Sequence, residues 1–316
     1  MECRRVGTSG LKVSAMALGT WFTFGNRVGQ EGATALVRRA LERGVNFFET
    51  ADVYALGKAE TLLGQALAAV PRKDYVLGTK CFFPTGDGPN DKGLSRKHIH
   101  ESCHASLRRL QTDYVDLFQC HRYDPETPVD ETVRALEDLC RQGTVLYWGV
   151  SMWSALQIEE GLEVAHEIGA RPPISHQHGY NLLERNIEVD VVPACEKHGL
   201  GILPYSPLAQ GVLTGKYVGG SFPDGTRADT ERARGMMGRF LAPEASERVE
   251  RFVKVAAQAG ETPGKLALAW LLGRPQVSSV LVGASSVAQL DENLDATDIT
   301  LQSDVAAALE EIFPAG

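Results

Sequence analysis

The feature that most restricts the fold of this chain is a repeated alternation between short apolar runs and longer amphipathic stretches. Runs rich in Val, Ile, Leu and Phe that are each followed by a helical pattern are typical of parallel strands covered by helices. The runs are Ala15–Gly19, Val45–Thr50, Tyr75–Thr79, Tyr114–Gln119, Val145–Val150, Ile174–Gln177, Gly201–Pro204 and Ser278–Val282. Because these eight units follow one another without a break in composition, we predict an α/β fold, a closed (β/α)8 TIM barrel, in a single domain over residues 1–316.

Three segments fall outside the eight units. The turn Thr8-Ser9-Gly10 between Arg4–Val6 and Leu11–Val13 predicts an N-terminal β-hairpin that closes the bottom of the barrel. The insert Lys216–Pro243 is long and weakly periodic, which is typical of a lid or a binding segment. We also expect extra helices at the C-terminus.

Helix boundaries are marked by capping patterns. Ser154 followed by Gln157 predicts a capping box, and Ser286 followed by Gln289 repeats the pattern. Thr262-Pro263 predicts an N-cap with proline in the first helical position. These signals place helix starts after the fifth and the eighth predicted strands. A third helix start falls between the seventh and eighth strands.

Charge and composition exclude several kinds of partner. The net charge of −8, from 32 Lys+Arg against 40 Asp+Glu, argues against nucleic acid, which needs a cationic face. The chain shows neither an apolar signal segment nor a run of about 18 apolar residues, so we expect no membrane span and a cytoplasmic protein. The six cysteines have no metal-ligand spacing, which predicts reduced thiols and no metal site.

Four polar residues lie at or near the ends of predicted strands: Glu49, Tyr54, Lys80 and His121. The active site of a (β/α)8 barrel lies at the C-terminal ends of its strands, so these side chains are expected to converge there. Each alone has an ordinary explanation as a surface charge, a packing residue or a hydrogen-bonded core histidine. Their coincidence at one mouth is harder to explain by packing and favours a catalytic group.

The chemistry expected of this group depends on the pKa of the phenol. An ammonium group beside a phenol favours the phenolate, so we expect Lys80 to lower the pKa of Tyr54. The carboxylate of Glu49 would hold Lys80 charged and oriented. His121 would orient a carbonyl oxygen or relay its proton.

Common nucleotide and metal motifs do not occur in the chain. It has no Gly-x-Gly-x-x-Gly after the first strand, no phosphate loop and no His-Glu-x-x-His helix. The turn Gly283-Ala284-Ser285-Ser286 precedes a helix, where free N–H groups and the helix dipole favour an anion such as a cofactor phosphate. A plain capped helix would use the same Ser286.

The stretch Gly44–Gly64, GVNFFETADVYALGKAETLLG, resembles the aldo-keto reductases. Gly93–His98, Tyr205–Leu208 and Ser278–Asn293 agree in the same order, so the resemblance spans nearly the whole chain. Gly57-Lys58-Ala59-Glu60 and the run GLSRKH are most similar to the branch that contains the β-subunits of voltage-gated potassium channels and their bacterial relatives.

This resemblance implies roles for the four polar residues. Tyr54 would be the general acid in reduction, Lys80 the partner that lowers its pKa, and His121 the residue that orients the carbonyl. Glu49 occupies a position where the family normally carries Asp, and its added methylene could misplace Lys80. We expect a compensating rotamer and retained activity.

The resemblance also implies an NADP(H) site. From the nicotinamide to the adenosine end, its residues would be Gly19, Thr20, Trp21, Ser151, Gln177, Tyr205, Ser206, Pro207, Leu208, Gly211, Lys216, Arg227, Gly283, Ser285, Gln289, Glu292 and Asn293. Many family members carry Lys and Arg around the 2′-phosphate, at positions that read Gly283 and Gln289 here. This difference weakens the case for NADP over NAD.

Three functions are compatible with these residues. The first is NAD(P)H-dependent reduction of a small-molecule carbonyl substrate, an aldehyde or ketone, to an alcohol, with Trp21, Phe22, Phe83 and Trp153 as pocket walls. The second is a cofactor-sensing regulatory subunit with little turnover. The third is a lyase that forms a Schiff base on Lys80. The sequence leaves the oligomeric state open, with a homo-oligomer as one option.

Overall fold

The barrel predicted from the alternation is present in the structure. The computed structural model describes residues 1–220, 222–223, 226, 228, 234–235 and 237–315. Within them, eight parallel strands form one sheet in the order β10-β3-β4-β5-β6-β7-β8-β9. Their bounds are β3 (Met16–Gly19), β4 (Phe47–Glu49), β5 (Val76–Cys81), β6 (Val115–Cys120), β7 (Val145–Ser151), β8 (Ser175–Gly179), β9 (Gly201–Tyr205) and β10 (Val280–Val282). All eight predicted strands are confirmed, with shifts of up to two residues at their ends.

The sheet closes between its first and last strands. The N–H of Ile202 donates to the carbonyl of Gln276 over 2.9 Å, and the N–H of Ser278 donates to the carbonyl of Ile202 over 2.9 Å. Ile202 and Val277 thereby form a parallel bridge just before β10 begins. The strands therefore form a (β/α)8 barrel rather than an open sheet.

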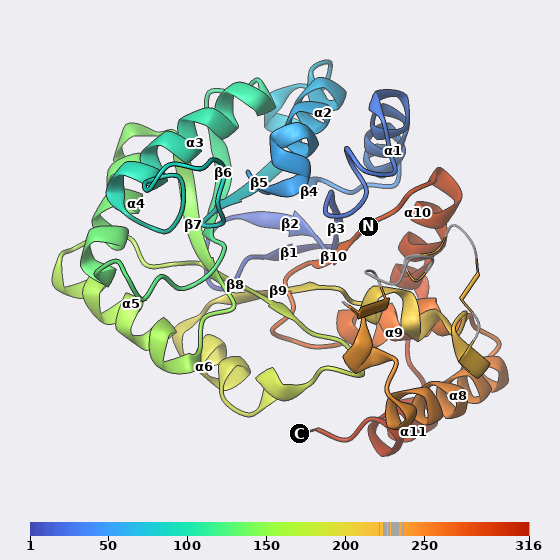
Figure 1. Cartoon of the computed structure of the whole chain (residues 1–316). Coiled ribbons are helices and arrows are strands. Elements are labelled where there is room, and N and C mark those ends of the chain that lie inside the picture. Colours follow the sequence, from blue (N-terminus) through green and yellow to red (C-terminus); the bar gives the residue numbers. More distant parts are fainter. Residues whose placement is uncertain (221, 224–225, 227, 229–233, 236, 316) are drawn as a thin grey trace.

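Helices surround the strands, as Figure 1 shows. The α-helices are α1 (Gln30–Glu42), α2 (Lys58–Leu67), α3 (Arg96–Leu110), α4 (Val129–Gln142), α5 (Ala155–Glu167), α6 (Val191–His198), α8 (Pro243–Gln258), α9 (Pro263–Leu272), α10 (Val287–Leu294) and α11 (Ser303–Ile312). The short 3-10 helices are η1 (Tyr54–Gly57), η2 (Arg72–Asp74), η3 (Asn186–Glu188), η4 (Ala209–Thr214), η5 (Val218–Gly220), η6 (Gly238–Phe240) and η7 (Asp295–Asp298). The helix α11, which follows the last strand–helix unit, confirms the expected C-terminal extension.

The predicted helix caps are confirmed with one exception. Ser154 and Gln157 form the complete capping box at the start of α5, and Thr262 caps α9 ahead of proline at its first turn. At α10, Ser286 accepts from the N–H of Gln289 over 3.2 Å. The second hydrogen bond predicted for that capping box does not form. The side-chain oxygen of Gln289 accepts from the N–H of Ser285, at 2.9 Å, instead of from the N–H of Ser286.

The predicted N-terminal hairpin is confirmed. Strands β1 (Cys3–Arg5) and β2 (Lys12–Ser14) are antiparallel, with Arg4 opposite Val13. The N–H of Thr8 donates to the carbonyl of Gly199 over 2.9 Å, immediately before β9. The hairpin therefore covers the end of the barrel where the strands begin, and leaves the other end accessible.

The interior of the barrel changes from apolar to polar along its axis. An apolar cluster that includes Val6, Val13, Phe47 and Leu117 fills the end under the hairpin. A larger apolar cluster lies between the strands and the surrounding helices. Buried polar side chains occupy the ends of β4, β5, β6 and β8 instead, and this separation places the candidate site at the C-terminal ends of the strands. No helix of the described residues is long and apolar enough to cross a membrane.

Candidate active site

A cavity of about 940 Å³ opens at the C-terminal ends of the strands. This volume lies near the upper end of the range usual for small-molecule and cofactor sites. The predicted site residues that line the cavity are Gly19, Trp21, Phe22, Glu49, Tyr54, Phe83, His121, Ser151, Gln177, Tyr205, Ser206, Pro207, Leu208, Gly211, Lys216, Gly283, Ser285, Gln289 and Asn293. Residues from almost the full length of the chain therefore meet at one surface.

A buried cation lies directly beneath the phenol of Tyr54. The side chain of Lys80, on β5, is fully buried, and its Nζ donates to the Tyr54 Oη over 2.9 Å and to the carbonyl of Thr50 over 2.8 Å. The ammonium also forms an ion pair with the carboxylate of Glu49, at the end of β4. Lys80 itself does not line the cavity. Its contacts with the cavity lining run through Tyr54 and Glu49.

The longer carboxylate at position 49 does not displace Lys80 from the phenol. Glu49 is 3 % exposed, and its Oε1 both contacts Lys80 and accepts from Nε2 of Gln177 over 3.2 Å. The extra methylene therefore lets one oxygen reach from β4 toward both β5 and β8. A consequence is that the Gln177 amide already has a partner within the barrel.

The pKa of Tyr54 differs from the sequence prediction. Burial of the phenol raises its pKa well above the usual value, and the negative charge of Glu49 raises it further. The expected net lowering of this pKa is therefore wrong, because the sequence did not show that burial of the phenol outweighs the favourable charges around it. Tyr54 is a neutral phenol at physiological pH, which is the protonation state of a proton donor.

His121 follows β6 and lies beside Tyr54. Its ring is edge-on to the Tyr54 ring at 5.7 Å between centroids and to the Phe83 ring at 4.8 Å. Burial lowers the pKa of His121 well below its usual value, and the positive charges of Lys80 and Arg122 lower it further. His121 is therefore a neutral imidazole. Its Nδ1 is buried and has no hydrogen-bond partner among the described residues.

Residues with left-handed backbone conformations cluster around the cavity. Phe22, Ala55, Ser206 and Gln210 all line it and have φ values of 63°, 49°, 50° and 61°. Such conformations cost roughly 1–2 kcal/mol per non-glycine residue, so the surrounding structure must enforce them. Strain of this kind is typical of ligand-binding and catalytic sites. It could not be predicted from the sequence, because Phe, Ala, Ser and Gln do not favour a positive φ.

The turn that carries Tyr54 is held from below by Asp52. The Ser102 hydroxyl of α3 donates to the Asp52 carboxylate over 2.7 Å, and the N–H of Asp52 donates to the carbonyl of Lys80 over 3.2 Å. Burial raises the pKa of Asp52 to about 7, although the Ser102 hydrogen bond lowers it. The loop after β4 is therefore fixed to both β5 and α3.

The residues along the cavity fit a dinucleotide. The Ser151 hydroxyl is buried and has no hydrogen-bond partner in the described residues, so it can contact a ligand amide in the cavity. Tyr205 forms part of the wall, and its hydroxyl contacts the sulfur of Met152 at 3.1 Å. Gly211 has φ +96°, and a Cβ there would lie 2.9 Å from Nζ of Lys216. The backbone of η4 can thus lie close to a phosphate that Lys216 contacts.

Besides Lys80, three predicted site residues in the described part of the chain do not line the cavity. Thr20 is fully buried and donates to Thr50 over 2.9 Å, and Glu292 is exposed outside the lining. Trp153 packs against the Tyr123 ring at 5.1 Å, and a Cβ at Gly161 of α5 would meet its ring. It therefore belongs to the packing between the sheet and α5. Arg227 lies outside the described residues.

Among the described residues, three cationic residues that line the cavity were not identified in the sequence: Arg27, Arg122 and Arg239. Arg122 donates to the carbonyl of His121 and lies over the Phe83 ring at 5.1 Å. Arg239 forms an ion pair with Glu184 at 2.8 Å. The strand-end rule that selected His121 would also have found Arg122, its neighbour. Nothing in the sequence singles out Arg239, because it lies in the weakly periodic insert.

Known proteins are similar to this chain over nearly its whole length. A model of the aldo/keto reductase family matches residues 15–313. A probable voltage-gated potassium channel subunit beta of Arabidopsis thaliana is 43 % identical over 302 residues, which cover 95 % of this chain and 92 % of the relative. A protein of the same description from Oryza sativa subsp. japonica is 44 % identical over the same shares. A putative subunit beta of Schizosaccharomyces pombe is 40 % identical over 320 residues, 98 % of this chain and 92 % of the relative.

Proposed function

Because the chain belongs to the aldo/keto reductase family, we propose that it is an NADP(H)-dependent oxidoreductase that reduces aldehydes or ketones to alcohols. The observation that carries this proposal is the contact between Tyr54 and Lys80. A neutral phenol faces the cavity, and a fully buried ammonium lies 2.9 Å behind its oxygen. This arrangement suits proton donation to an oxygen bound in the cavity.

In this proposal the bound coenzyme supplies a hydride to the carbonyl carbon. Tyr54 then donates its phenolic proton to the carbonyl oxygen, and the phenolate that remains is stabilised by Nζ of Lys80. Glu49 keeps Lys80 charged although burial lowers the pKa of that ammonium. The neutral imidazole of His121 donates a hydrogen bond to the same carbonyl oxygen, so two donors share the developing negative charge.

The residues proposed to hold the coenzyme fall into three groups along the cavity. Ser151 and Gln177 would contact the carboxamide, and Tyr205 would stack on the nicotinamide ring. Gly211 and Lys216 would hold the pyrophosphate. Ser285, Gln289 and Asn293 would contact the adenosine end, beside the N-terminus of α10. Trp21, Phe22 and Phe83 remain as apolar walls for the substrate.

The test is consumption of NADPH by purified protein with a panel of aliphatic and aromatic aldehydes and ketones. We expect turnover with at least one class of substrate and its loss in Tyr54→Phe, with coenzyme binding unchanged. Loss of a positioned acid lowers rates about 10²–10⁴-fold. Equal turnover by Tyr54→Phe would contradict the assigned role. Circular dichroism of both proteins controls for folding.

The names of the relatives favour a second candidate function. Proteins described as probable or putative voltage-gated potassium channel β-subunits are 40–44 % identical to this chain, which supports a role as a subunit of a larger assembly. In that role the site would sense its coenzyme and hardly turn over. Tight NADPH binding without turnover across the carbonyl panel would favour this function. A Schiff-base lyase is disfavoured, because Lys80 contacts three oxygen atoms and does not line the cavity.

A further inference from the structure

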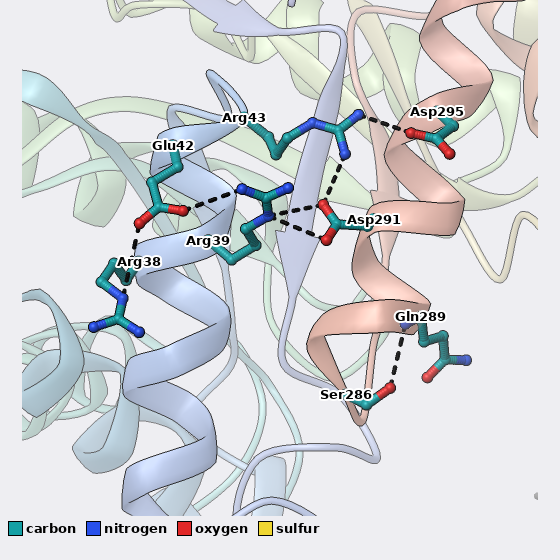
Figure 2. Close-up of polar contacts among 8 residues, drawn as sticks. All are labelled: Arg38, Arg39, Glu42, Arg43, Ser286, Gln289, Asp291 and Asp295. Carbon is teal, nitrogen blue, oxygen red and sulfur yellow. Dashed lines mark hydrogen bonds and ion pairs between the residues drawn. The ribbon is translucent and has the colours of Figure 1, made fainter.

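Helix α10 presents two different faces. Gln289 and Asn293, one turn apart, line the cavity. Asp291 and Asp295, the residue that caps the end of α10, are also one turn apart and point toward α1, as Figure 2 shows. Spacings of four residues place side chains on the same face of a helix. The helix therefore lies between the cavity on one side and α1 on the other.

Arg39 of α1 and Arg43, which caps the end of α1, hold the acidic face of α10. The carboxylate of Asp291 accepts from Nε of Arg39 over 2.9 Å and from Nη1 of Arg43 over 2.7 Å. Arg43 also donates to Asp295 over 3.0 Å. Asp295 contacts Lys265 of α9 at 3.1 Å. A continuous chain of charges thus joins α1, α10 and α9.

The hydrogen bonding between strands β9 and β10 is incomplete. In the described residues, β9 and β10 are joined through Ile202 near the start of β9, whereas the later residues of β9 form no ladder with β10. The loop from β10 to α10 leaves the sheet at this gap. The Gln289 side chain accepts from the N–H and hydroxyl of Ser285, so the loop is tied to the helix. The position of α10 therefore determines the position of the loop.

An isolated exposed ion pair contributes little to stability, but this cluster differs from such a pair. The side chains of Arg43 and Asp291 are only 24 % and 28 % exposed, and one carboxylate is shared by two guanidinium groups. A contrasting side chain lies on the same helix: Arg38 is 75 % exposed and contacts Glu42 at 3.8 Å, within α1. Figure 2 shows Arg38 on the side of α1 away from α10, whereas Glu42 also accepts from Arg39 over 3.2 Å.

We propose that Arg39 and Arg43 are positioning residues for the coenzyme, because they hold α10 where Ser285, Gln289 and Asn293 can contact its adenosine end. The inference rests on the proposed function and adds to it residues that do not touch the ligand. It predicts an effect on binding rather than on the chemical step. The hydrogen bonds and ion pair of Lys80 (β5) are made to Tyr54 (η1), Thr50 and Glu49 and not to α10.

The experiment measures the dissociation constants of NADPH and of adenosine 2′,5′-bisphosphate by fluorescence and calorimetric titration. The proteins are the wild type, Arg43→Met, Asp291→Asn, their double variant, and Arg38→Met as the matched control. Methionine retains most of the apolar stem of arginine. The turnover rate at saturating NADPH is recorded in parallel, and thermal melts confirm that each variant folds.

We expect both dissociation constants to rise roughly threefold to tenfold in Arg43→Met and in Asp291→Asn, with little further rise in the double variant. Arg38→Met should bind like the wild type. Asp291→Asn separates positioning from simple charge attraction, because it makes the protein more positive yet is expected to bind an anion more weakly.

Unchanged affinity in the folded Arg43→Met and Asp291→Asn variants would overturn the inference while leaving the proposed function intact. Tighter binding by Asp291→Asn, or an equal loss in Arg38→Met, would assign the effect to overall charge and would also overturn it. Failure of the wild-type protein to bind NADPH would overturn both the inference and the proposed function.

Discussion

The amide nitrogen of Gln177 lies 3.2 Å from Oε1 of Glu49, the same oxygen that meets the ammonium of Lys80. One carboxylate therefore connects the proton-donating pair to a residue proposed to bind the nicotinamide carboxamide. A shorter Asp at position 49 would not span the same distance. The substitution that distinguishes this chain from the usual family pattern thus reaches beyond Lys80 to a second part of the site.

Shortening this carboxylate should change coenzyme binding. In Glu49→Asp the Gln177 amide loses its partner in the barrel and becomes available to a ligand, so we expect NADPH to bind about threefold more tightly. Fluorescence titration measures the change. In a Gln177→Ala background the same substitution should have no effect. Weaker binding in Glu49→Asp would show that Glu49 orients Gln177 instead of competing for it.

Neutralising the carboxylate should destabilise the fold. Glu49→Gln leaves the ammonium of Lys80 fully buried without its counter-charge, and breaking one side of a buried pair typically costs about 3–5 kcal/mol. Urea unfolding followed by circular dichroism measures the loss. Glu42→Gln, at an exposed ion pair on α1, is the control and should change stability little. Equal stability of Glu49→Gln and the wild type would contradict this view of Lys80.

Asp52 should make stability depend on pH. Its pKa rises on folding from 3.8 to about 7, chiefly because the carboxyl is buried. Between these values the folded state keeps a proton that the unfolded state has lost, so the stability due to this group falls as pH increases, by up to about 1.4 kcal/mol per unit, and levels off above about pH 7.

Asp52→Asn removes that dependence, and its amide oxygen can still accept from Ser102. The free energy of unfolding of the variant minus that of the wild type should therefore increase as pH rises from about 4 to 7. Above that range this difference should be constant. Urea unfolding at a series of pH values measures the difference. A difference that does not vary with pH would mean that Asp52 is ionised throughout in the folded protein.

Glycine at position 211 should matter for the coenzyme. Gly211→Ala places a methyl group 2.9 Å from Nζ of Lys216 in a left-handed backbone conformation, so we expect some loss of stability and roughly tenfold weaker NADPH binding. Gly219→Ala is the matched control, because Gly219 also has a positive φ, +75°, but no atom of the described residues lies within 4 Å of the added carbon. It should lose stability without a change in affinity. Equal affinities would exclude Gly211 from the coenzyme site.

The barrel could be predicted from the sequence because its signal is local. Strands such as β10, which reads VLV, are continuous apolar runs, and the rule that active sites lie at the C-terminal ends of strands was enough to select Tyr54, Lys80 and His121. The hairpin was also visible, because its turn residues and flanking alternation lie within a dozen positions of each other.

Features that depend on tertiary surroundings were not predictable. The pKa of Tyr54 rises because several segments together exclude water from it, which no local pattern reports. Trp153 was expected at the cavity, but Met152 has φ +59° and turns the chain, so Trp153 packs against α5 instead. The ion pairs of Arg43 join residues about 250 positions apart. The sequence contains no signal for such a pairing.

The most direct test of the central claim follows the hydride itself. Purified protein is mixed with an aldehyde and NADPH that carries deuterium at the transferable position, and the alcohol is analysed by mass spectrometry. We predict deuterium on the carbinol carbon with the wild type, and formation at least about 10²-fold slower with Tyr54→Phe at equal coenzyme occupancy. Equal transfer by Tyr54→Phe, or no transfer by wild-type protein saturated with coenzyme, would contradict a reductase built on Tyr54 and Lys80.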